Sequence, residues 1–319
     1  MSIIIKKSKP TGKKMQRKKV VKAEYIHGDS RKELDKLILK GKKFQLIMTS
    51  PPYNMDREYE KSQSLDNYSK EITYVVEKLV ELLDENGSLC WQVGNYIHPI
   101  TKEVVPLDIF YHNLFKSKGL ILRNRIIWHF EHGLHASNRF SGRYETIMWY
   151  SKSDSYTFNL DDVRVPAKYP GKTYYKGEKK GQISGNPKGK NPSDIWKILG
   201  ENWNNEIWPI PNVKANHKEK TIHPCQYPVE LVERCILALT NKGDWVLDPY
   251  SGVGSTIIAA LKNGRNSVGI EKYKRYVTVG EKRISDFRKG TLKLRQLGQP
   301  VFEPNQQMSV ARKPAHFLY

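Results

Sequence analysis

Apolar residues along this chain alternate between two spacings. Short continuous runs, such as those in FQLIMTS (44–50) and SLCWQVG (88–94), are typical of buried strands. Longer stretches, such as RKELDKLILKG (31–41) and EITYVVEKLVELLDENG (71–87), place apolar residues three or four positions apart, which predicts amphipathic helices. The second helix is expected to end at Gly87, since glycine commonly terminates helices.

The same alternation continues on both sides of a central interruption. Strands are predicted in segments 23–29, 120–130, 144–153, 244–248 and 265–271, and helices in 105–119, 223–243, 255–264 and 272–287. Strands that alternate with helices favour a parallel sheet covered on both faces. The predicted fold class is therefore α/β, with a doubly wound and mostly parallel sheet.

Changes in this pattern divide the chain. Residues 57–69 are polar and predict a mobile loop, and from Asp154 to Lys220 the alternation gives way to Gly, Pro, Asn, Lys and aromatic residues. The predicted organisation is a basic disordered tail (1–22), a first half-domain (23–153), a loop-rich insertion (154–220), a second half-domain (221–295) and an unpatterned tail (296–319).

Composition favours a soluble cytoplasmic protein. The 319 residues are 38% hydrophobic, which is enough for a buried core, and we find neither an eighteen-residue apolar run nor a signal peptide. Three cysteines, Cys90, Cys225 and Cys235, form no CxxC pair, so neither a disulfide framework nor a zinc knuckle is predicted. The cluster of His129, His132 and His135 has no second ligand motif, and no metal is expected.

The formal net charge of +21 favours a polyanionic partner. Residues 1–22 carry nine Lys or Arg and no acid, so +12 remains without them (21 − 9), and the insertion is basic as well. We therefore predict binding to nucleic acid; a solubilising lysine-rich surface is the alternative. Trp196, Trp203 and Trp208 favour packed structure in the insertion over a disordered linker. The candidate DNA-contacting residues are Arg139, Arg143, Lys172, Lys179, Lys180, Lys188 and Lys190.

A glycine loop follows the strand WVLD. In DPYSGVGST (248–256), Gly252 and Gly254 allow a tight turn close to a ligand, and Asp248 stands at the carboxyl end of its strand, where open α/β sheets bind ligands. Glu271 ends the next strand, at a position suited to accepting bonds from both hydroxyls of a ribose. The loop has neither the GxGxxG spacing nor the lysine of a P-loop, and we expect a different nucleoside cofactor.

The strand at 44–49 stops at the unusual sequence TSPPYN (49–54). Ser50 offers a hydroxyl, Pro51 a carbonyl held in a rigid Pro-Pro corner, Pro52 shapes that corner, and Tyr53 adds an aromatic ring. By itself this motif is compatible with an ordinary tight turn. The glycine loop two hundred residues later makes a shared site more plausible.

Together the two motifs resemble those of DNA amino-methyltransferases. DPYSGVGST is similar to their S-adenosylmethionine loop, TSPPY to their catalytic [DNS]-P-P-[YFW] motif, and HPCQYPVEL (223–231) to the segment that completes their methionine pocket. The catalytic motif precedes the cofactor loop, which resembles the permuted beta class. The resemblance implies a Rossmann-like methyltransferase fold, with 154–220 as the target-recognition region.

The resemblance also implies roles for single residues. Ser50 and the Pro51 carbonyl would accept hydrogen bonds from a base amino group, and Tyr53 would stack on a base flipped out of the duplex. Asp29 would contact the cofactor adenine, although a helix N-cap role is equally compatible. The implied S-adenosylmethionine-binding residues are Asp29, His223, Pro224, Asp248, Pro249, Tyr250, Gly252, Gly254, Ser255, Thr256 and Glu271.

Serine at the first position of the catalytic motif resembles cytosine-N4 enzymes, whereas aspartate is usual in adenine-N6 enzymes. The expected function is site-specific N4-cytosine methylation of double-stranded DNA, with N6-adenine methylation as the alternative. A cognate restriction endonuclease acting separately, and a monomeric or dimeric state, are further expectations. An RNA or protein-amide methyltransferase and a non-catalytic nucleic-acid binder remain as rival functions.

Overall fold

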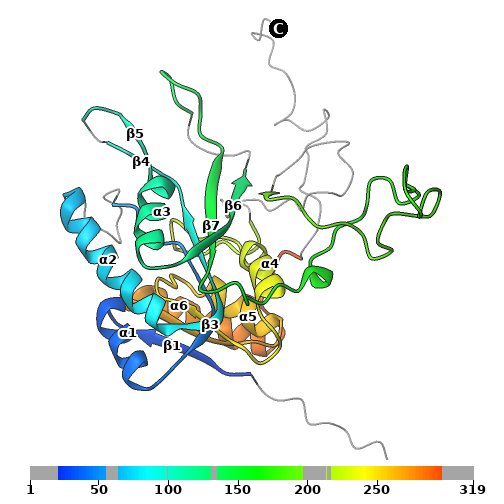
Figure 1. The fold of residues 1–319 in the computed structure, drawn as a ribbon. Coiled ribbons are helices and arrows are strands. Elements are labelled where there is room, and N and C mark those ends of the chain that lie inside the picture. Colours follow the sequence, from blue (N-terminus) through cyan, green and yellow to red (C-terminus); the bar gives the residue numbers. More distant parts are fainter. Residues whose placement is uncertain are drawn as a thin grey trace, which may run out of the picture.

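The computed structural model describes residues 21–54, 64–98, 100–130, 135–196, 213 and 217–296. Within these ranges eight strands form one sheet in the order β1-β10-β9-β2-β3-β7-β6-β8 (Figure 1). Strand β7 runs antiparallel to both of its neighbours, and the other neighbouring pairs are parallel. The predicted mostly parallel α/β sheet is confirmed. The strands are β1 (Ala23–His27), β2 (Phe44–Thr49), β3 (Leu83–Val93), β6 (Ile121–His129), β7 (Tyr144–Ser151), β8 (Ile195–Trp196), β9 (Trp245–Asp248) and β10 (Asn266–Glu271).

Helices cover both faces of the sheet. One face carries α1 (Ser30–Leu39), α2 (Leu65–Leu82) and α3 (Leu107–Ser117), and the other carries α4 (Val229–Leu239), α5 (Ser255–Lys262) and α6 (Lys274–Arg288) (Figure 1). Alternate side chains of a strand point to opposite faces, so β2 feeds both cores. Leu46 and Met48 pack with α4 and α5, while Ile47 packs with α1 and α2. The continuous apolar run in β2 is therefore the signature of a strand buried on both sides.

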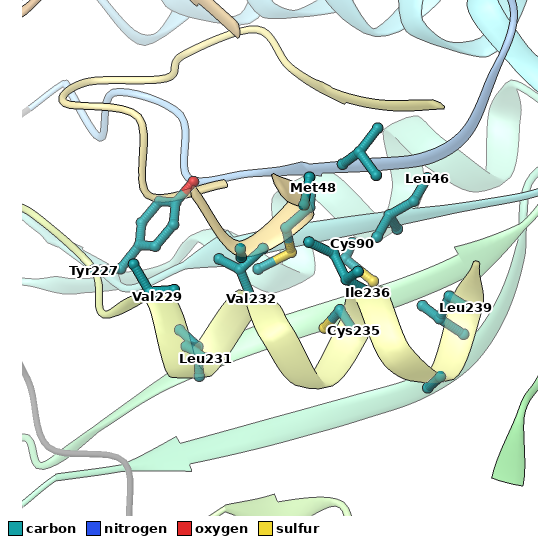
Figure 2. Close-up of a cluster of buried hydrophobic side chains, with 14 of the residues drawn as sticks. Leu46, Met48, Cys90, Tyr227, Val229, Leu231, Val232, Cys235, Ile236 and Leu239 are labelled. Atoms are coloured by element: carbon teal, nitrogen blue, oxygen red, sulfur yellow. The ribbon is translucent and has the colours of Figure 1, made fainter. Parts of the chain in front are cut away.

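Helix α4 shows how one core is filled. Its apolar side chains, including Val232 and Ile236, face Leu46 and Met48 of β2, and Cys235 lies beside Cys90 of β3 (Figure 2). All three cysteines are free, and Cys225 alone is exposed. Within the described ranges, no helix combines the length and apolarity needed to cross a bilayer.

The chain reverses its direction across the sheet between β9 and β2. From β2 it passes through α2 to β3 on one side, and from β9 through α5 to β10 on the other. Open α/β sheets bind ligands at such a switch point, outside the carboxyl ends of the strands. The motif TSPPYN leaves β2 there and the glycine loop leaves β9, so the topology brings the two motifs together.

Two predicted boundaries are wrong. Helix α2 begins at Leu65, where the Ser64 side chain accepts a hydrogen bond from the Asn67 amide, so residues 65–69 are helical and not loop. The helix ends at Leu82, since Leu83 is already extended and pairs with Phe44 in β2. Gly87 lies inside β3, where the pairing register shifts. Residues 55–63 of the predicted loop lie outside the described ranges.

The sequence pattern did not predict the short strands. A hairpin of β4 (Asn95–Ile97) and β5 (Val104–Pro106) precedes α3, and β8 from the predicted insertion pairs with β6 at the sheet edge. A 3-10 turn, η1 (Leu160–Asp162), also falls in the insertion. Trp196 is buried, whereas Trp203, Trp208, the tail to residue 20 and the tail from 297 lie outside the described ranges.

Gly280 of α6 is a packing requirement that can be tested. A Cβ atom at this position would lie 2.0 Å from Cε1 of Tyr25 in β1. The Tyr25 ring has little freedom to move, because its hydroxyl donates to the Gly252 carbonyl. We predict that Gly280→Ala lowers the free energy of unfolding by about 1–2 kcal/mol, because overpacking outweighs the gain in helix propensity.

Urea denaturation measures this change. Gly171→Ala is the matched control, because its added Cβ would meet no atom within 4 Å, and it should stay within about 0.5 kcal/mol of the parent. Equal stability of the two variants would contradict the packing argument.

Candidate active site

The carboxylate of Asp248 joins the two motifs at the switch point. Four donors from the described residues reach it: the Thr49 hydroxyl at 2.7 Å, the Tyr250 amide at 3.1 Å, the Tyr227 hydroxyl at 2.5 Å and the Thr256 hydroxyl at 2.6 Å. Asp248 is 0% exposed, and burial raises the pKa of its carboxyl despite these bonds. Its oxygens are thus occupied from within the fold, and Asp248 positions both loops.

The catalytic motif turns sharply after β2. The Ser50 hydroxyl lies 3.0 Å from the Tyr53 hydroxyl, which also donates to the Gln92 carbonyl at 3.4 Å. The Tyr68 hydroxyl of α2 donates to the Pro52 carbonyl at 2.7 Å. Asn54 ends the turn at φ 59°, a conformation that asparagine tolerates better than most residues. These contacts fix the ring of Tyr53 and the hydroxyl of Ser50 side by side.

The Pro51 carbonyl remains available. No hydrogen bond to it is recorded among the described residues, whereas the neighbouring Pro52 carbonyl is taken by Tyr68. Pro52 also contributes no amide donor that could compete locally. Ser50 and Pro51 line the same cleft, and each carries a hydrogen-bond acceptor.

The glycine loop is held from several sides. Gly252 at φ 55° and Gly254 at φ 78° adopt the left-handed region that favours glycine. The Pro249 carbonyl accepts from Ser30, and the Gly252 carbonyl accepts from Tyr25. With both carbonyls tied back to the β1–α1 segment, the loop forms a fixed cradle at the start of α5.

Glu271, at the end of β10, closes this cradle. Its carboxylate accepts from the Gly252 amide at 3.0 Å and the Tyr273 amide at 2.7 Å. Burial is the main reason that its pKa rises to about 7; the two amide bonds lower the pKa and the charge of Asp248 adds to the rise. A carboxylate has about four acceptor positions, so Glu271 retains capacity for further donors.

A cleft of about 1320 Å³ lies over the two motifs. Asp248, Gly254 and Thr256 are not among the residues that line it, and these three act from beneath the surface. The predicted site residues that line it are Asp29, Ser50, Pro51, Pro52, Tyr53, Arg139, Arg143, His223, Pro224, Pro249, Tyr250, Gly252, Ser255 and Glu271.

His223 and Pro224 form one wall beside the glycine loop. The His223 ring stands 4.5 Å from the ring of Tyr276, edge to face, and a Cβ on Gly252 would come within 3.3 Å of its Nε2. Absence of a side chain at Gly252 therefore lets the histidine approach the loop. The methionine-pocket role implied for this wall stays a prediction.

Asp29 has the N-cap role that the sequence left open. Its side chain accepts from the Arg31 amide at 3.0 Å and forms an ion pair with the Arg31 guanidinium at 2.8 Å. The hydrogen bonds from Arg31 hold the pKa of the Asp29 carboxyl below its usual value. Asp29 also lines the cleft, so capping and ligand contact are compatible.

The predicted basic residues fall into two groups. Arg139 and Arg143 line the cleft, whereas the five lysines of the insertion lie away from it. Lys172, Lys179 and Lys180 are exposed, and Lys188 pairs with Asp161 at 2.6 Å. Lys190 is half-buried. A DNA-contacting role for these residues stays a prediction.

The histidine cluster gives no metal geometry to describe. Across the ranges that the structure covers, no three His, Cys, Asp or Glu side chains converge as a metal-binding group. His135 lies 3.3 Å from the Arg143 guanidinium through its Nδ1. His132 lies outside those ranges.

Gln92 and Glu145 are site residues that sequence reasoning missed. The buried Gln92 amide donates to the Glu145 carboxylate, and its Oε1 is buried without a partner in the described structure. A Cβ on Gly94 would lie 3.3 Å from the Tyr53 ring and 3.6 Å from Glu145, so these two side chains flank one small space. The sequence did contain one signal for these residues, since Gln92 is a polar residue within the apolar run of β3.

Tyr227 and Thr49 were also missed, although both hold Asp248. Tyr227 precedes α4 and is buried, and its hydroxyl contacts both Asp248 and Thr256. Burial raises the pKa of its hydroxyl, so it remains a donor. Its place in the segment HPCQYP gave no sign of this contact.

Comparison with known proteins identifies the family of this chain. The N6/N4 methyltransferase family model, described as DNA methylase, matches residues 44–282. Type II methyltransferase M.BglII of Bacillus subtilis is 42% identical over 240 residues, which cover 75% of this chain and 63% of that relative. DNA adenine methyltransferase YhdJ of Escherichia coli K12 is 30% identical over 264 residues, 81% of either chain. The solved PvuII DNA methyltransferase (cytosine-N4-specific) superposes with a TM-score of 0.60 at 18% identity, covering 85% of this chain and 93% of that one.

The Asp248 contacts predict a graded loss of stability. Asp248→Ala would leave buried donors without an acceptor, and we expect it to lower the free energy of unfolding by about 3 kcal/mol. Asp248→Asn keeps one acceptor oxygen and should lower the free energy of unfolding by less. Tyr227→Phe removes a single donor and should cost about 1 kcal/mol.

Denaturant unfolding of the three variants checks this order. Asp29→Ala is the control, because the Asp29 carboxylate caps a helix and forms a partly exposed ion pair. Its loss should lower the free energy of unfolding by about 1 kcal/mol. If Asp248→Ala were no more costly than this control, the carboxylate would not be the junction of the two motifs.

Proposed function

This chain belongs to the N6/N4 DNA methylase family, and we propose that it moves a methyl group from S-adenosylmethionine to the exocyclic N4 of cytosine in double-stranded DNA. The observation that carries the choice of cytosine is Ser50, a hydroxyl where adenine-N6 enzymes usually have a carboxylate. The name of the Bacillus subtilis relative, a Type II methyltransferase, supports a place beside a separate restriction endonuclease.

N6-adenine methylation is the second candidate. The E. coli relative named as a DNA adenine methyltransferase, 30% identical over most of both chains, favours it. Cytosine N4 and adenine N6 are both amino groups conjugated to an aromatic ring. A pocket that accepts two hydrogen bonds from such a group serves either base, and the first residue of the motif therefore carries the distinction.

The residues beside the glycine loop suit a nucleoside with a positively charged sulfonium. Glu271 retains acceptor capacity for ribose hydroxyls, and Gly252 lines the same cleft beside it. His223 and Pro224 form the wall proposed for the methionine part. When bound, S-adenosylmethionine supplies an electrophilic methyl group, so the protein needs no covalent nucleophile of its own.

At the other end of the cleft, this chain orients the base. The amino nitrogen is a weak nucleophile, because its lone pair is delocalised into the ring. Hydrogen bonds from its two N–H groups to the Ser50 hydroxyl and the Pro51 carbonyl would direct that lone pair toward the methyl group. The Tyr53 ring, fixed by its bonds to Ser50 and Gln92, supplies a stacking surface.

Methyl transfer from tritiated S-adenosylmethionine to plasmid DNA tests the proposal. After digestion to nucleosides, we expect the label in N4-methylcytosine, and modification-sensitive sequencing then gives the recognition site. Label confined to N6-methyladenine would identify adenine as the target base in place of cytosine. Absence of label in DNA would reject the proposed function.

Ser50→Ala should lower kcat about 100-fold, because it removes one hydrogen bond that stabilises developing charge. DNA binding should persist, which separates catalysis from a binding-only role. Tyr53→Phe keeps the stacking ring and should retain more activity than Tyr53→Ala. Ser155→Ala, an exposed serine outside the cleft, should behave as the parent. Parental kcat in Ser50→Ala would remove Ser50 from the mechanism.

Glu271 predicts a pH dependence of cofactor binding. Its pKa of about 7 lies above the ordinary value, so the folded protein favours the neutral form below pH 7, which accepts ribose hydroxyls less well. If the ionised form is the one that binds, the Kd for S-adenosylmethionine should be about tenfold higher at pH 6 than at pH 8.

Calorimetric titration at both pH values measures the ratio. The ligand itself and the other ionisable groups of the protein still titrate in Glu271→Gln, so this variant isolates the contribution of Glu271. This variant should bind weakly with a flatter pH profile. A profile as steep as that of the parent would contradict a role for Glu271.

A further inference from the structure

Among the described residues that line the cleft, the most exposed apolar side chain is Phe140, in the turn of residues 135–143 that precedes β7. Its side chain is 101% exposed, although it belongs to the lining of the cleft that holds Ser50 and Tyr53. A fully exposed phenylalanine lacks the stabilisation that burial of its ring would provide. Its position at the mouth of the candidate base pocket points to a partner that covers it.

The turn that carries Phe140 is held in place. The Ala136 amide donates to the Ser141 hydroxyl at 3.1 Å, which closes the turn on both sides of Phe140. The Phe130 amide donates to the Arg143 carbonyl at 2.8 Å, so the turn continues from the β6–β7 pairing. Phe140 is thus projected by a supported hairpin.

The same hairpin is connected to the base pocket. Strand β7 pairs with β3 between Thr146 and Val93, and Glu145 accepts from Gln92 next to the catalytic motif. The position of Phe140 relative to Tyr53 is therefore set by the central sheet. If Phe140 acts together with the pocket, this connection through β7 and β3 is what keeps the two in a fixed relative position.

The charges around Phe140 favour a polyanion over an apolar partner. Arg139 precedes it and Arg143 follows it, and both line the same cleft. Arginines on each side suit phosphates that flank an inserted ring. Together with the net charge of +21, this favours DNA over a second copy of this basic chain.

Resting on the proposed function, we propose that Phe140 is a wedge that enters the DNA stack and fills the space left by the flipped target base. Apolar side chains that insert between bases unstack them, which costs free energy. Burial of the Phe140 ring offsets part of that cost. Phe140 is thereby a positioning residue, which acts on the opening of the duplex and not on methyl transfer itself.

Two duplexes that carry the mapped recognition site test the wedge. One is fully paired, and the other has an abasic nucleotide opposite the target base, which removes the pairing that must be broken. Phe140→Ala should lower kcat/KM at least tenfold on the paired duplex and less than twofold on the abasic one. Phe140→Trp should restore the rate on the paired duplex to within threefold.

Leu39→Ala is the matched control, since Leu39 is an apolar residue 87% exposed at the end of α1 and outside the cleft. It should leave both rates unchanged. Equal losses of Phe140→Ala on the two duplexes, or no loss on either, would overturn the wedge. Failure of the parent protein to methylate the paired duplex would instead reject the proposed function, so the two failures are distinguishable.

Discussion

The buried carboxylate of Asp248 is the interaction on which the site depends. It connects Thr49 at the end of β2 to the glycine loop after β9, across 199 residues of sequence. Burial opposes its ionisation, and the hydrogen bonds from Thr49, Tyr227, Thr256 and the Tyr250 amide compensate for the lost water. Because these donors come from four segments, the catalytic corner, the glycine loop, α5 and the approach to α4 keep one relative position.

The position of Asp248 at this junction explains why its surroundings differ from those of Glu271, the acid that ends the following strand. Asp248 accepts four hydrogen bonds inside the fold, whereas Glu271 lines the cleft and accepts bonds from backbone amides. Both carboxyls have a raised pKa because of burial, but only Glu271 borders space that a ligand could fill. A motif read as one cofactor site thus separates into a structural acid and a ligand-facing acid.

The sequence predicted most of the sheet and both loops, because continuous apolar runs and a glycine loop are local signals. It failed where the deciding interaction is between strands. Gly87 resembles a helix stop, yet the pairing of Leu83 with β2 ends the helix earlier. Gln92 and Glu145 meet only through the register of β3 with β7, and β8 consists of two residues whose pairing with β6 no periodicity could reveal.

The same cross-strand registry separates the residues proposed for catalysis from those proposed for DNA contact. Ser50 and Glu271 follow or end buried strands, so their positions are as rigid as the sheet, whereas Phe140 and Arg139 stand on a turn beyond the strand ends. Under the proposed function, substitution in the turn would alter contact with the duplex without disturbing the acceptors proposed to orient the amino group. Since Glu145 lies near the start of β7 and contacts Gln92 beside Tyr53, the turn is connected to the TSPPYN motif through β3. Under the proposed function, opening of the duplex and orientation of the target base would therefore need no large motion of the protein between them.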